Sequence, residues 1–173
     1  MRRRLRIRRF SGDERGAALV EFTLVLPFLM LLAAGIAEFG FMLHQQQLIY
    51  KAVRDAGRYA ARYPYATTAA CALSGEPEWA TMVANTKNVA LRGQVSGGAF
   101  LLSSWNNVSM VTVAEIARSV PGGGSSPLGL LCTTASVISV TASAPFAGTG
   151  FLGFLGIGAF NLTASHDEMW AGL

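Results

Sequence analysis

The sequence predicts a membrane-anchored α+β protein, in which a long N-terminal transmembrane helix continues into a small domain with a second helix and an antiparallel sheet of about three strands. Three observations predict this class. An apolar run extends from Ala17 to Leu43 with only two charged residues, Glu21 and Glu38. Helical periodicity then continues to Tyr63, and segments rich in β-branched residues follow in the second half of the chain. A length of 173 residues suits one anchor and one modest domain.

The positive charge of the chain is concentrated at its N-terminus. Half of the 14 Lys and Arg residues lie in a basic leader, residues 1–16, although the whole chain is 51% hydrophobic and only 14% charged. Beyond the leader, seven basic and eight acidic side chains remain, a net charge of −1. Because the basic cluster adjoins an apolar helix, we interpret it as a topology signal and predict no nucleic-acid binding.

The segment 17–43 is long enough to cross a bilayer. As a helix it measures roughly 40 Å, whereas the hydrocarbon core is about 30 Å thick, so it can span with some tilt. The positive-inside rule places the leader in the cytoplasm and the residues after Leu43 across the membrane. A cleaved signal peptide is the alternative, with a weak site at Gly35-Ile36-Ala37, but the apolar run is long for such a peptide. Pro27 interrupts the helical pattern, so we expect a kink or local melting near Thr23–Pro27.

Glu21 does not suit a plain anchor. A carboxylate deep in hydrocarbon costs on the order of 3 kcal/mol. Glu21 either lies at the headgroup boundary and reaches water or is kept for a partner, and we favour the partner. We interpret Glu38, at the outer end of the apolar run, as an interfacial residue.

These residues together carry a family resemblance. The basic leader, Gly16, four mostly apolar residues and then Glu21-Phe22 resemble the prepilin-peptidase site of type IV pilins. The stretch G-A-A-L-V-E-F-T-L-V-L-P, followed by G-I-A-E-F-G, resembles the TadE-like minor pilins (pseudopilins) of Tad/Flp pilus systems over about residues 14–64. Major Flp pilins usually carry Tyr where this chain has Phe22, and they are much shorter, which favours a minor component.

The resemblance implies a cut by a prepilin peptidase between Gly16 and Ala17. It implies that Glu21 is the assembly carboxylate, pairing with the new Ala17 amine of a neighbouring subunit. The implied partners are the prepilin peptidase, the major Flp pilin and other minor pilins, the inner-membrane pilus platform and the lipid bilayer. The implied location is the bacterial inner membrane, single-pass, with the N-terminus cytoplasmic and the C-terminal domain periplasmic; entry into the pilus is left open.

Residues 44–63 continue the helix with an amphipathic pattern. Polar residues 44–47 mark the exit into water, and Pro64 ends the helix. The apolar face predicts packing on the chain's own domain, with packing against neighbouring subunits as the alternative. The face comprises Leu48, Ile49, Ala52, Val53, Ala56, Tyr59, Ala60 and Tyr63.

Residues 64–173 are predicted to form the periplasmic α+β domain. Its helix starts at Pro77, a residue favoured at the first helical position, and stops at Gly93. Three strands are expected, over Val108–Ala114, Thr134–Ala142 and Phe160–Met169.

Two glycine-containing segments connect the expected strands. Residues 121–127 are interpreted as a flexible connection, and they lack the Gly-Lys-Ser/Thr ending of a phosphate-binding loop. The apolar run Gly150–Phe160 is too short to span a membrane. It is a core-covering loop, a membrane-surface contact or a docking patch, and we favour core cover.

Cys71 and Cys132 both follow the membrane segment, on the side predicted to be oxidising, so we predict a disulfide. Closing a loop of about 60 residues is worth roughly 4 kcal/mol in the chain-entropy model. Two unpaired buried thiols are the alternative, because geometry decides the pairing.

No nucleophile, base and orienting residue are grouped in the sequence. His44 has no ligand-spaced partner, and His166-Asp167-Glu168 is interpreted as a solvated strand end. We therefore predict no enzyme, no cofactor and no metal site. The alternative function is an uncleaved, single-pass membrane-anchored binding module whose periplasmic domain recognises a ligand or partner.

Overall fold

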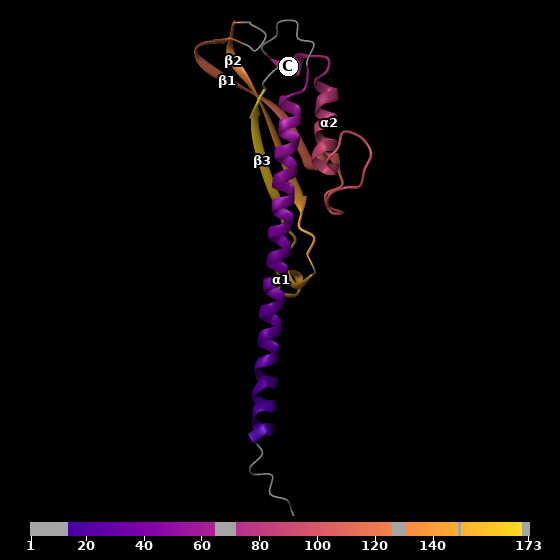
Figure 1. The fold of residues 1–173 in the computed structure, drawn as a ribbon, viewed down its shortest axis with the longest axis vertical. Helices are drawn as coiled ribbons and strands as arrows, with labels where there is room; N and C mark the ends of the chain where they lie inside the picture. Colours follow the sequence, from indigo (N-terminus) through magenta and orange to yellow (C-terminus); the bar gives the residue numbers. More distant parts are fainter. Residues whose placement is uncertain (1–13, 65–71, 126–130, 149, 171–173) are drawn as a thin grey trace, which may run out of the picture.

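A long helix forms the axis of the molecule (Figure 1). The computed structural model describes residues 14–64, 72–125, 131–148 and 150–170. Helix α1 (Glu14–Ala61) carries the second helix and the sheet along its upper half, whereas its lower half extends alone. The predicted fold class is confirmed: a long N-terminal apolar helix, a further helix and a three-stranded antiparallel sheet.

Helix α1 is continuous through Pro27, so the local melting expected near this residue is not seen. Proline removes the N–H that would bond the carbonyl of Thr23. The Thr23 hydroxyl donates to the Leu19 carbonyl at 2.7 Å, which adds a bond in the turn before the proline. A kink at Pro27 stays a prediction.

Both helices end close to the predicted residues. Helix α1 ends at Ala61 rather than Tyr63, because the Tyr63 N–H donates to a carbonyl three residues earlier, at 3.2 Å, and tightens the last turn. Helix α2 (Trp79–Arg92) begins two residues after Pro77. It stops at Gly93, whose φ of 75° lies in the left-handed region that glycine adopts readily.

The sheet is a meander with β2 (Leu131–Pro145) at its centre, between β1 (Val111–Ser125) and β3 (Asn161–Met169). Both strand pairs are antiparallel, and Val140 of β2 lies opposite Val113 and His166. The strands predicted over Thr134–Ala142 and Phe160–Met169 are confirmed, and β2 extends beyond its predicted bounds at both ends.

The prediction for the first strand was wrong at both of its ends. Residues Val108–Met110 form a 3₁₀ turn, η2, instead of strand. The Asn107 side chain accepts a hydrogen bond from the Ser109 N–H at 2.9 Å, a local turn that competes with strand pairing.

Beyond Ala114, β1 continues into the glycine-rich segment that was predicted to be a flexible connection. Gly124 pairs with Cys132 across the ladder. The register shifts between Ser119 and Gly124, an irregularity of the kind that lets strands accommodate proline and glycine.

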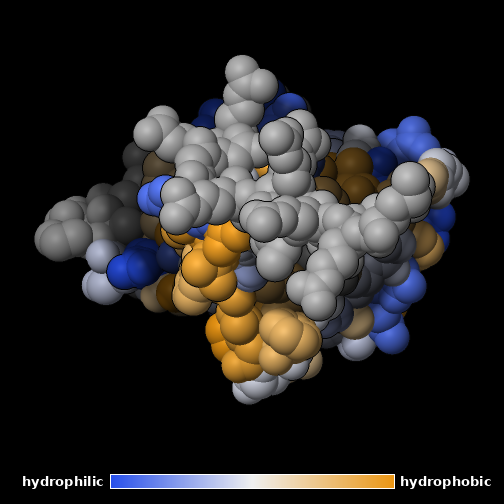
Figure 2. Space-filling model, turned by 90° about the horizontal axis from the view of Figure 1, so that it is seen from below, coloured by the Kyte–Doolittle hydropathy of each residue, from blue (hydrophilic) through white to orange (hydrophobic). Residues whose placement is uncertain are grey.

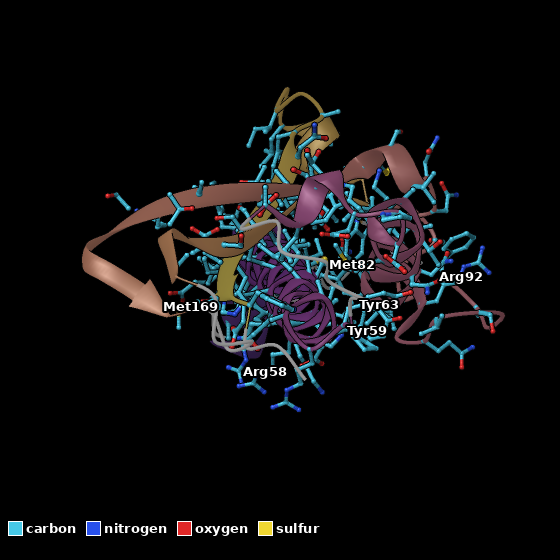
Figure 3. All side chains as sticks on the ribbon, turned by 90° about the horizontal axis from the view of Figure 1, so that it is seen from above. Arg58, Tyr59, Tyr63, Met82, Arg92 and Met169 are labelled. Carbon is cyan, nitrogen blue, oxygen red and sulfur yellow. The ribbon has the colours of Figure 1, made fainter. Side chains whose placement is uncertain are left out.

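The core lies between α1, α2 and the sheet, as seen down the helix axis in Figure 3. Met82 of α2 lies on the side of α1 opposite to Arg58, which projects outward. The predicted packing of residues 44–63 on the chain's own domain is therefore confirmed. The fully buried side chains include Ile49, Val53, Leu73, Met82, Leu91, Trp105, Ile138 and Val140.

Most of the run Gly150–Phe160 does not cover the core, contrary to our favoured interpretation, although Phe160 at its end packs against the core. It forms a short helix, α3 (Phe151–Phe154), and a turn beside the middle of α1 (Figure 1). Phe154 is 81% exposed, and Leu155 and Ile157 are also exposed. The core is already closed by the sheet and α2, which leaves these side chains outside it.

Candidate functional site

The N-terminal half of α1 presents apolar side chains on all sides. From Leu19 to Leu32 the large apolar side chains are exposed, and only Leu26 is partly covered. The most apolar window of the helix has none of its residues buried inside the molecule. Such a long, uncovered apolar helix fits a membrane anchor, because the side chains that find no protein partner can face lipid.

Gly16, Ala17 and Glu21 all lie in the first turns of α1 and are exposed. A Cβ at Gly16 would meet no atom of the residues that the structure describes within 4 Å, so those residues leave the predicted cleavage position open. Glu21 has no hydrogen-bond or ion-pair partner among the described residues. The three residues are therefore accessible along the helix, with the carboxylate about 6 Å beyond Ala17 at 1.5 Å per residue.

Glu38, which we predict to be an interfacial residue, is covered by the chain itself, and its depth in the membrane stays a prediction. It is only 1% exposed, because the segment that leaves β2 crosses over it. A Cβ at Gly148 would collide with Glu38 Oε1 and with the ring of Phe146. Glycine at this position therefore lets the backbone approach the carboxylate closely.

The glutamines expected to mark the exit into water instead attach α1 to the sheet. Gln45 is 3% exposed; its Nε2 donates to the Ala147 carbonyl at 2.7 Å, and its Oε1 accepts from the Ala147 N–H at 3.4 Å. Gln46 donates to the Thr163 carbonyl at 2.8 Å. The two side chains thus bind backbone groups of Ala147, just beyond β2, and of Thr163 in the edge strand β3. Sequence polarity alone could not distinguish this role from solvation.

His166 is not at a solvated strand end, contrary to the prediction. Its ring packs on α1, where a Cβ at Gly57 would lie 3.0 Å from the ring carbon Cδ2. Its Nε2 lies 2.7 Å from Oε2 of Glu168, two residues along the same face of β3. Asp167, on the other face, lies 3.9 Å from exposed Arg118. His166 therefore joins β3 to the helix, whereas Asp167 lies near Arg118 of β1.

Glu115 of β1 holds the short 3₁₀ turn η1 (Leu73–Gly75) against the sheet. Its carboxylate accepts from the N–H groups of Leu73 and Ser74, at 2.8 and 2.7 Å, and from the Ser136 hydroxyl at 2.5 Å. Partial burial by itself raises the pKa of Glu115, but the hydrogen bonds from Ser136, Leu73 and Ser74 together hold that pKa below its usual value. Sequence analysis missed this contact, because the chain gives no local signal for it.

The predicted disulfide stays a prediction. Cys71 lies outside the described residues, and for Cys132 only the backbone, in β2, is described. The Glu115 contact places Leu73, two residues after Cys71, beside Ser136, four residues after Cys132.

No group of three or more His, Cys, Asp or Glu side chains suited to a metal occurs within the residues that the structure describes. A groove of about 460 Å³ lies between α1 and α2, with His44, Lys51 and Asp55 of α1 along one wall and Val89 and Leu101 on the other. A groove of this kind suits the alternative function, a ligand-binding module.

The geometry thus fits a membrane-anchored protein in which one long helix, α1, serves as the anchor and also as the central helix of a head, the part formed by the second half of α1 with α2 and the sheet. Residues 16–58 match the family model described as TadE-like protein, which confirms the predicted resemblance. The match begins at Gly16 and ends within α1, so it includes the anchor and the packed half of the helix but not α2 or the sheet. No curated protein and no solved structure gives a significant match. The family is structural and indicates a protein associated with Tad pili.

Proposed function

We propose that this chain is a minor pilin or pseudopilin that takes part in the assembly or export of a Tad/Flp-type pilus. The observation that carries the proposal is the start of the TadE-like match at Gly16, on an uncovered apolar helix that exposes Glu21 about one and a half turns later. A protein that acted alone would gain nothing from a lone carboxylate at this place. A subunit of an assembly would use it to recognise its neighbour.

A prepilin peptidase cuts between Gly16 and Ala17 in this proposal. The open surroundings of Gly16 support it, because a peptidase must reach the scissile bond. The peptide must also leave the helical conformation to be cut. Glycine lowers the cost of unwinding, since it stabilises a helix interior by about 1 kcal/mol less than alanine does. The arginine-rich leader stays on the cytoplasmic side, and the head lies in the periplasm.

Glu21 then becomes the assembly carboxylate. Cleavage leaves a positive amine on Ala17, and Glu21 of a neighbouring subunit pairs with it inside a bundle of apolar helices. Each charge alone is costly in hydrocarbon, so pairing favours the staggered arrangement that brings the two together. The partners in this proposal are the peptidase, the major Flp pilin, other minor pilins and the inner-membrane platform.

The N-terminus of the protein from native membranes tests cleavage. Intact mass and N-terminal sequencing should give a chain that starts at Ala17, and Gly16→Leu should leave a chain that starts at Met1. Gly40→Leu is the matched control, because Gly40 is another exposed glycine of α1 with nothing near its Cβ position, and this variant should still be cut. A wild-type chain that starts at Met1 would reject the proposal and favour an uncleaved binding module that uses the groove between α1 and α2.

Assembly is tested with Glu21→Gln, which keeps the shape and removes the charge. Cleavage should persist, while recovery of the protein with Tad pilus components should fall. Glu21→Gln that co-purifies as well as the wild type would contradict the assembly role while leaving the cleavage result intact.

A further inference from the structure

The apolar loop that carries α3 is placed at the level where α1 leaves the membrane. Phe151 packs on α1 at Gly35, where its Cε1 lies 3.8 Å from the position that a Cβ would occupy. Gly35 precedes Leu43, the last residue of the apolar run, by eight residues, or about 12 Å along a helix. Counted from the other side, about 20 helical residues cross a 30 Å hydrocarbon core, which takes a span that starts at Ala17 to Ile36. The two estimates place α3 between the edge of the hydrocarbon and about 12 Å below that edge, within the outer leaflet.

The surface of this loop is apolar and uncovered. Residues 150–160 contain no charged or polar side chain, and Phe154, Leu155 and Ile157 are 81%, 47% and 48% exposed. Viewed from the membrane end of the molecule, strongly hydrophobic residues project to one side of the axis, whereas hydrophilic residues lie farther round the edge (Figure 2). Ile36 and Phe39 of α1 are exposed at the same level, so the loop enlarges the apolar surface of the anchor.

We propose that the loop Gly150–Phe160 inserts into the outer leaflet of the bilayer that α1 spans, as a second, interfacial membrane contact of the head. The inference rests on the membrane anchoring in the proposed function, and it does not require cleavage or pilus assembly. Lipid is the occupant because the loop is continuous with the apolar surface of the anchor and is held at the depth of the interface. Apolar side chains that enter the interface gain free energy in proportion to the area removed from water.

The contact also explains the buried carboxylate next to it. The segment from β2 to α3 covers Glu38 at Gly148, and Gln45 holds that segment through Ala147. Glu38 is therefore shielded from the acyl chains by the same backbone that carries the loop into the leaflet. Two attachment points, the helix and the loop, fix which side of the head faces the membrane, whereas a lone helix leaves the head free to rotate about its axis.

Depth-dependent quenching by brominated phospholipids tests the inference on the full chain, with one copy in each lipid nanodisc. Three single variants each introduce a tryptophan at an exposed aromatic position: Phe154→Trp in the loop, Phe28→Trp in the span and Tyr50→Trp on the head. The wild type supplies the background from the native tryptophans Trp79, Trp105 and Trp170. We expect Phe154→Trp to lose about as much emission as Phe28→Trp does. For Phe154→Trp the loss should be greatest when the bromines lie near the headgroup. Tyr50→Trp should show no loss beyond that of the wild type.

The outcomes separate the two proposals. Strong quenching of Phe28→Trp without quenching of Phe154→Trp would overturn the loop insertion and leave the anchor standing. A blue-shifted but unquenched Phe154→Trp would also overturn it, because the loop would then be covered by protein rather than lipid. Lack of quenching at Phe28→Trp would reject the membrane anchor itself, and the loop insertion with it.

Discussion

The two halves of α1 use one continuous helix in opposite ways. From Leu19 to Leu32, the apolar side chains are large, lie on all sides and remain almost entirely uncovered. Beyond Leu43, one face of small and β-branched residues is buried against the sheet and α2, and basic residues occupy the exposed face. The first half suits fluid hydrocarbon, which adapts to side chains of any shape. The second half packs against a protein surface, where the loss of even one methyl group leaves a gap. The same residue type should therefore matter greatly in one half and little in the other.

The largest effect is expected from isoleucine truncation in the two halves. Ile49 is fully buried and Ile36 is 66% exposed. Ile49→Ala should lower the free energy of unfolding of the head by about 2–5 kcal/mol, through lost burial and a residual cavity. Ile36→Ala should change it by less than about 0.5 kcal/mol. Denaturant unfolding in micelles, followed by the fluorescence of the native tryptophans, measures both variants. Equal losses of stability would contradict the difference between the two halves of α1.

The predicted disulfide extends the comparison of the two halves, because both of its cysteines lie in the part of the chain that follows α1. Reduction of Cys71–Cys132 should lower the free energy of unfolding of the head by roughly 4 kcal/mol and leave the helix content of the span unchanged. Alkylation before and after reduction, read by intact mass, checks that the bond exists. If protein taken from native membranes and unfolded without reductant had both thiols alkylated, the pairing would be contradicted.

Glycine substitutions give a smaller effect of the same kind. Gly57 packs against His166 of β3, and Gly40 faces open space on the same helix. Gly57→Leu should destabilise the head by about 1–3 kcal/mol, because a side chain must force β3 away. Gly40→Leu should be nearly neutral for the head. The same denaturant titration measures the pair, and a neutral Gly57→Leu would mean that the helix–strand contact is loose.

The smallest effect expected is acid sensitivity of the head at Glu115. Its pKa is held below the usual 4.5 in the folded chain, so the unfolded chain binds the proton first, and stability falls as pH drops through the folded pKa. Glu115→Gln should cost about 1 kcal/mol at pH 7, because the carboxylate is only partly shielded from water. The difference between wild type and variant should shrink at acidic pH. A difference that stays constant from pH 7 to about pH 3 would contradict the charge-assisted role.

The sequence predicted both halves of α1 where local composition or helical period determines the structure. Hydropathy alone predicted the anchor, because the suitability of a helix for lipid depends on its local composition. The helical period of 3.6 residues predicted the buried face around Ile49 and Val53. The Gly16–Glu21 pattern was found through the family resemblance, which the match over residues 16–58 confirms.

Contacts between distant residues could not be predicted. The roles of Gln45, Glu38 and Glu115 depend on partners more than 20 residues away, at Ala147, Gly148 and Leu73. The glycine-rich end of β1 looked flexible because its strand pairing depends on β2, which follows it in the chain. The Gly150–Phe160 run looked like core because its hydrophobicity suits a core as well as a membrane surface.

The continuity of α1 has a mechanical consequence. No linker separates the anchor from the core, so a pull along the span reaches the head as shear between α1 and the sheet. A slip by one helical turn, about 5.4 Å, would bring Val53 or Ala61 to the place opposite His166 that Gly57 now fills. Side chains would collide there, and sliding is opposed by steric interlock rather than by the strength of any single bond. Under tension the anchor and the head therefore move together as one rigid unit, because no flexible joint between them can absorb the force.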